Sequence, residues 1–90
     1  MLNIIEVARN TCTAADLVGE RYGLTETERE MLHLLATGYR VPEIADALFL
    51  ANGTIRNRLS LIYTKIGVQN QIQLMTMLHR IAASLTPNPA

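Results

Sequence analysis

The chain has 90 residues, of which 49% are hydrophobic, 18% are charged and 4% are aromatic, and its formal net charge is zero. This composition excludes a disordered protein and is typical of one small, aliphatic, all-α domain. The apolar runs are too short to span a bilayer, no secretory signal is recognisable, and a single cysteine cannot form an internal disulfide, so we expect a cytoplasmic protein.

The zero net charge conceals an uneven distribution along the chain. Residues 1–48 hold eight acids against four arginines, which leaves a charge of −4, whereas residues 49–90 hold four cations and no acid, which gives +4. Because binding responds to the local field, the second part is predicted to seek anions.

The first predicted helix covers residues 3–22. Its apolar side chains fall close to one side: Ile4, Ile5, Ala8, Cys12, Ala15, Val18 and Tyr22. We expect a packing helix or linker over residues 1–23, ended by Gly23, and a buried, inert thiol at Cys12.

A clear helix start follows at residues 24–28. Thr25 can cap the helix while Glu28, three residues later, reaches back to the Thr25 amide as a capping box. The buried side is predicted to be Met31, Leu32, Leu34, Leu35 and Ala36. The glutamates of the first turn favour a solvated, dipole-complementing role over catalysis, and His33 has no partner at metal-ligand spacing.

Two further helices follow in close succession. Pro42 suits the first turn of a short helix over residues 42–49, with Ile44, Ala45 and Leu48 directed inward. Asn52 and Gly53 could form a hairpin turn, but the period after them is 3.6, which favours a helix over about residues 53–66 with Asn52 near its N-cap.

That helix, residues 53–66, combines an apolar stripe with a basic remainder. The stripe consists of Ile55, Leu59, Ile62 and Ile66, which recur at steps of four, three and four. The other positions carry basic and polar residues and no acid, as a helix lying against a polyanion requires.

The last predicted helix begins near Asn70. One apolar stripe holds Leu74, Leu78, Ile81 and Leu85, and a second beside it holds Ile72, Met75 and Ala82. The combined arc is wider than one small core needs, so either the N-terminal helix or another subunit is expected to cover it. Residues 86–90 are predicted to be a disordered tail.

A short helix, a tight turn and a longer basic helix form the order of a helix-turn-helix, in which the first helix braces the second so that it enters the DNA major groove. The sequence contains no nucleophile–base pair, phosphate-binding glycine loop or metal cluster. We therefore expect a protein that is not an enzyme and needs no cofactor or metal.

Residues 24–78 closely resemble the DNA-binding domain of the LuxR family of bacterial regulators, shared with NarL/FixJ and GerE-like proteins. The residues that carry the resemblance are Leu24, Thr25, Glu28, Arg29, Glu30, Leu32, Leu35, Gly38, Glu43, Ile44, Ala45, Leu48, Gly53, Thr54, Ile55, Leu59, Ile62, Tyr63, Lys65, Ile66, Val68 and Asn70. The resemblance implies a four-helix domain over residues 24–85, with residues 1–23 as an additional N-terminal helix, and DNA recognition by residues 53–66.

The resemblance also implies roles for individual residues. The expected readers of base edges are Arg56, Asn57 and Ser60, and the expected phosphate anchors are Thr54, Arg58, Tyr63 and Lys65. Homodimerisation is implied for the last helix, through Ile72, Met75, His79 and Ala82. The implied partners are double-stranded DNA, a second copy, and RNA polymerase or an upstream regulatory domain.

Some positions depart from the family pattern. Arg56 and Arg58 stand where lysine and histidine are usual, Ala51 replaces a capping serine, and Leu61 stands where asparagine is common. Leu61 and the apolar arc of the last helix leave an alternative open, a helix-turn-helix used for contact with another regulator or a sigma factor.

Overall fold

The computed structural model describes residues 4–85, with their side chains from residue 9 onward, and this part of the chain is all-α, with no strand. The helices are α1 (Ile4–Arg21), α2 (Glu26–Ala36), α3 (Val41–Leu48), α4 (Asn52–Ile66) and α5 (Gln71–Ser84). The predicted helix is therefore confirmed over the hairpin alternative at Asn52 and Gly53, and the predicted tail at 86–90 lies outside the described residues. None of these helices has the length and apolarity needed to cross a membrane.

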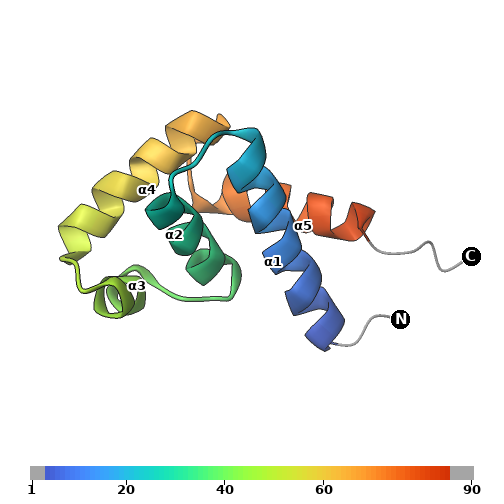
Figure 1. Ribbon diagram of the computed structural model, residues 1–90, viewed down its shortest axis with the longest axis horizontal. Coiled ribbons are helices and arrows are strands. Elements are labelled where there is room, and N and C mark those ends of the chain that lie inside the picture. Colours follow the sequence, from blue (N-terminus) through green and yellow to red (C-terminus); the bar gives the residue numbers. More distant parts are fainter. Residues whose placement is uncertain (1–3, 86–90) are drawn as a thin grey trace, which may run out of the picture.

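The helices are arranged around α2. It contacts α1 on one side and α3 and α4 on the other, and α1 also packs along α5. Figure 1 shows α4 above α2 and α3, with α1 and α5 crossing at the other end of the molecule. Thus α2 joins the helix-turn-helix to α1, and α1 in turn packs on α5.

Local sequence explains where the helices begin. The predicted capping box at α2 is confirmed, because the Thr25 amide donates to Glu28 Oε1 at 2.8 Å and the Glu28 amide donates to Thr25 Oγ1 at 3.2 Å. In α5, Asn70 Oδ1 accepts the Gln73 amide at 2.9 Å. By contrast, α4 has Ala51 rather than Asn52 at its N-cap and no side-chain cap, so its first turn depends on packing.

The core confirms most of the predicted inward positions. Its fully buried large side chains come from every helix: Val18, Met31, Leu32, Leu35, Ile44, Ile55, Ile62, Leu74 and Leu78. Leu34 and Ala36, predicted on the buried side of α2, are half-buried and pack against the edge of the core. Leu85 is also wrongly predicted to face inward, since it follows α5 as its C-cap residue and is 39% exposed.

The additional helix α1 buries Thr11, Ala14, Ala15 and Val18. Cys12 is half-buried, so the prediction of a buried thiol is wrong: the buried face of α1 is rotated toward Ala14. The helix also packs on α5 and covers part of its wide apolar arc. Coverage by the N-terminal helix was one of the two expected arrangements. A hydrogen bond of 2.5 Å between Asp16 Oδ1 and His33 Nε2 joins α1 to α2.

The connection between α3 and α4 contains one residue with an unusual backbone. Phe49 has a φ of 56° and is the sole non-glycine residue in the left-handed region among those described. Its side chain is 93% exposed. The turn is closed by the Leu50 amide, which donates to the Ala45 carbonyl at 2.9 Å.

Candidate nucleic-acid interface

The apolar stripe of α4 fixes which face of this helix meets solvent. Ile55 and Ile62 are 0% exposed, and Leu59 and Ile66 are at most 5% exposed, where α4 packs on α2 and α3. Gly67, with a φ of 88°, ends the helix by donating its amide to the Tyr63 carbonyl at 2.8 Å. The helix is thus held along its whole length, and its opposite side is free to meet a ligand.

This opposite side, which we call the outer face of α4, is made of Asn57, Ser60, Leu61 and Thr64, all exposed. No acidic residue occurs anywhere in α4. Thr64 Oγ1 donates to the Ser60 carbonyl at 3.0 Å, which turns the Thr64 hydroxyl hydrogen toward its own helix. Leu61, which is 59% exposed, is the one large apolar side chain on the outer face.

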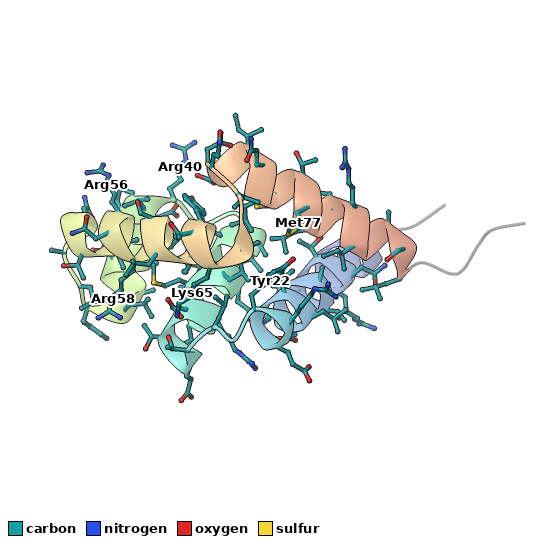
Figure 2. All side chains as sticks on the ribbon, turned by 90° about the horizontal axis from the view of Figure 1, so that it is seen from above. Tyr22, Arg40, Arg56, Arg58, Lys65 and Met77 are labelled. Carbon is teal, nitrogen blue, oxygen red and sulfur yellow. The ribbon has the colours of Figure 1, made fainter. Side chains whose placement is uncertain are left out.

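Cations flank the outer face on both edges. At about 100° per residue, Arg56 and Arg58 lie on nearly opposite sides of the helix. Figure 2 shows Arg56 projecting from one edge of α4 and Arg58 from the other. A ligand against the outer face would therefore meet a guanidinium on either side.

Arg40 is an additional candidate that was not predicted as a site residue. It precedes α3 as its N-cap residue and is exposed, while its amide donates to Glu43 Oε1 at 3.0 Å. Figure 2 shows its side chain on the same edge as Arg56. In the sequence, Arg40 is visible as a cation immediately before the short helix. Its position beside α4 follows only from the packing of α3.

Lys65, predicted as a phosphate anchor, has a partner inside the protein. Its Nζ atom lies 2.7 Å from Oε1 of Glu28, whose side chain is 8% exposed, while the Lys65 side chain is 40% exposed. Burial acts to raise the pKa of the Glu28 carboxyl, but hydrogen bonds from Lys65 and Thr25 outweigh it, and the net pKa is lowered. Lys65 is thus a tether between α4 and α2 that keeps part of its surface exposed.

The remaining predicted contacts lie nearer to the protein body. Thr54, Arg58 and Tyr63 are half-buried, in contrast to Arg56, Asn57 and Ser60, which are exposed. Burial raises the pKa of the Tyr63 hydroxyl above its usual 10.0, so this group stays a neutral hydrogen-bond donor. The structure therefore brings all seven predicted residues onto one helix, with the base-reading candidates outermost.

The four residues predicted for dimerisation differ in their access to solvent. Ile72 is 78% exposed and His79 is exposed, whereas Met75 is half-buried and Ala82 is only 8% exposed. Ala82 belongs to the core, so in one copy of the chain the accessible part of this face consists of Ile72, His79 and the edge of Met75. Among the described residues no group of acids, histidines and cysteine converges as metal ligands would.

Comparison with known proteins gives a consistent match over the helix-turn-helix. The family model described as bacterial regulatory proteins, luxR family, matches residues 23–78. The chain is 43% identical over 61 residues to the transcriptional regulatory protein DesR of Bacillus subtilis, and 35% identical over 65 residues to the DNA-binding transcriptional activator DevR/DosR of Mycobacterium tuberculosis. It is 38% identical over 58 residues to the spore germination protein GerE of Bacillus subtilis.

The length of the matched region differs among these relatives. The alignments cover 68%, 72% and 64% of this chain, respectively, but 31% of DesR, 30% of DevR/DosR and 78% of GerE. The chain thus spans about a third of the first two relatives and most of the third. No solved structure matches the chain significantly.

Proposed function

Because the chain belongs to the LuxR family of bacterial regulatory proteins, we propose that it binds double-stranded DNA sequence-specifically as a transcriptional regulator. The observation that carries the proposal is the outer face of α4, which is free of acids and flanked by Arg56 and Arg58 on a helix held by its buried stripe. A braced helix of this kind fits the major groove, about 12 Å wide.

Base reading is assigned to Asn57 and Ser60 on the outer face of α4 and to Arg56 at its edge, all of them exposed. Arg56 can present two parallel donors to the O6 and N7 acceptors of guanine, and Asn57 can pair with the N6 and N7 groups of adenine. Ser60 lies one turn further along the same face and can donate or accept. Leu61, the exposed apolar side chain beside Ser60, is assigned no base contact.

Phosphate contact is assigned to the flanking cations. Arg40 and Arg58 lie on opposite edges of α4 in Figure 2, so each would face a different strand of the duplex. Lys65 contributes its exposed part while remaining bound to Glu28. Thr54 and Tyr63 would add neutral hydrogen bonds to the backbone.

A homodimer is proposed for the DNA-bound form, with α5 as its interface. Ile72, which is 78% exposed, and His79 would pack against the same residues of a second copy, with Met75 beside them. Ala82 would support this face from below. Sedimentation of the complex should give two chains per duplex, and Ile72→Glu should give one chain or abolish binding.

The decisive experiment is selection of bound duplexes from a random pool, followed by an electrophoretic shift on the selected sequence. We expect two related half-sites about 34–36 Å apart or a multiple of that spacing, because two copies related by symmetry read the groove twice. Absence of any shift on selected or random duplex at low salt would contradict the proposal.

A second candidate is a helix-turn-helix that contacts a protein, such as another regulator or a sigma factor. The specific observation in its favour is Leu61, an apolar side chain 59% exposed on the outer face of α4. Leu61→Asn separates the two candidates, since it should leave DNA binding in place but weaken a protein contact. We further propose RNA polymerase and an upstream regulatory domain as partners. The proposed location of the protein is the cytoplasm.

A further inference from the structure

A groove of about 420 Å³ lies between α2 and α3, outside the surface assigned to DNA. Its apolar floor is formed by Leu34, Ala47 and Leu48. Leu34 and Leu48 are half-buried and Ala47 is exposed, so apolar surface remains open to solvent here. No residue of α4 lines the groove, and none of the proposed DNA contacts does.

The rim of the groove carries two glutamates, one arginine and one histidine, so acids outnumber permanent cations there. Glu26 and Glu30 are exposed and take part in no ion pair within the described residues. The two basic groups at the rim are engaged elsewhere: His33 pairs with Asp16, and Arg29 Nε donates to the Leu24 carbonyl at 3.3 Å.

Arg29 is also held in place by its fit against α1. A Cβ atom added at Gly19 would lie 2.9 Å from Arg29 Cγ, so the arginine stem packs directly over this glycine. Its stem and Nε atom are therefore held against Gly19 and Leu24. The two glutamates outnumber this single arginine, so the net charge above the apolar floor is negative.

We propose that this groove docks a basic amphipathic helix of a protein partner. Such a helix presents apolar side chains at positions i, i+3, i+4 and i+7, which would fill the floor, and its flanking lysines or arginines would pair with Glu26 and Glu30. The charge complementarity excludes a nucleic acid as the occupant, because phosphates would be repelled by the same carboxylates.

A larger groove of about 640 Å³ between α1 and α5 lacks this preference. It is lined by apolar residues together with Glu20 and Arg21, one of each sign, so its charge selects no partner. The α2–α3 groove differs because its two glutamates outnumber its one arginine. Docking there leaves α4 accessible, so the partner and DNA can be bound at the same time.

The test uses a fluorescein-labelled helical peptide with three leucines at i, i+4 and i+7 and lysines at the flanking positions. Its matched control carries glutamates in place of the lysines. We expect anisotropy to show saturable binding of the lysine peptide alone, and ¹⁵N amide shifts of the full chain to concentrate in residues 26–34 and 43–48. Equal binding of both peptides, or shifts confined to α1 and α5, would overturn the proposal.

Two variants locate the site. Ala47→Arg places a large cationic side chain over the apolar floor. It should weaken binding of the lysine peptide at least tenfold. Glu30→Gln should weaken it about threefold, whereas Glu20→Gln, which removes one acid elsewhere, should have no effect. Unchanged affinity in Ala47→Arg would refute the groove. All three variants should shift duplex DNA as the wild type does, which keeps this test separate from that of DNA binding.

Discussion

The Nζ atom of Lys65 and the Oε1 atom of Glu28 lie 2.7 Å apart, although the two residues are 37 positions apart in the sequence. The same Glu28 oxygen accepts the Thr25 amide at 2.8 Å. One nearly buried carboxylate therefore starts α2 and also holds the last turn of α4. The orientation of the proposed recognition helix is thus linked to the start of the helix that supports it.

Lys65→Met should destabilise the fold by about 1–2 kcal/mol, because it leaves the Glu28 carboxylate with one charged donor fewer in a poorly solvated place. The half-exposed position of Lys65 keeps the loss below that of a fully buried pair. Urea unfolding measures the effect as a lower midpoint at unchanged slope. Arg9→Met is the matched control and should change the midpoint little; equal midpoints for the two variants would contradict the tether.

The pH dependence of stability should report Glu28. Its folded-state pKa is below the ordinary 4.5, so the folded state binds fewer protons and the stabilisation is present above that pH and is lost as the pH falls through the folded pKa. The urea midpoint of the wild type should therefore decline below about pH 5, and that of Glu28→Gln should decline less. Glu30→Gln, at an exposed position, should follow the wild type. If the urea midpoint of Glu28→Gln followed the same pH curve as that of the wild type, Glu28 would not be the group responsible.

Arg56→Ala should relax base preference. Loss of a bidentate contact to guanine costs about 1–3 kcal/mol on the selected duplex and much less on a duplex changed at that base pair. Arg58→Ala should instead weaken both duplexes by the same factor, because a phosphate contact carries no sequence information directly. Fluorescence anisotropy on the two duplexes measures both variants. The same pattern in both would show that the division into readers and anchors is incorrect.

Arg40→Ala should reduce the salt dependence of DNA binding. Arg40, Arg58 and Lys65 in two copies give about six phosphate contacts, so the log–log salt slope should be about −5 to −6. Removal of two contacts should bring it to about −3 to −4. Affinities between 50 and 200 mM salt measure the slope. Arg9→Ala removes the same charge from α1 and should leave the slope unchanged; a change equal to that of Arg40→Ala would indicate only a general charge effect.

Ala51→Ser should stabilise the protein by about 0.5–1 kcal/mol. The Ala51 backbone already has the extended conformation of an N-cap residue, with φ −73° and ψ 152°, but no side chain caps the first turn of α4. A serine hydroxyl can accept a free amide of that turn. Ala83→Ser, at an exposed position near the end of α5, provides the control and should not stabilise. A urea midpoint that fails to rise in Ala51→Ser would mean that water already satisfies these amides.

The sequence predicted the helices well because their signals are local. The capping box at Thr25 and Glu28, the proline at 42 and the glycine at 67 each mark a boundary through its own backbone chemistry. The apolar stripe of α4 is likewise a property of spacing along a single helix. For these elements, the preferences of neighbouring residues and the final packing agree.

The pairings between distant helices could not be predicted in the same way. Helical angles place Lys65 at an edge of α4, but only the packing of α4 on α2 determines that this edge faces Glu28. The position of Arg40 beside Arg56 depends in the same way on α3. In α1, small residues occur on adjacent faces, so periodicity alone could not distinguish Cys12 from Ala14 as the more deeply buried.

Phe49 shows what determines the angle between α3 and α4. A non-glycine residue in the left-handed region costs about 1–2 kcal/mol, and a side chain that is 93% exposed recovers almost none of this through packing. The packing of α3 on α4, in which Ile44 and Ala45 are buried, must therefore hold the turn in place. The packed helices rather than the connection therefore determine the crossing angle, and the turn adopts the backbone conformation that this angle requires.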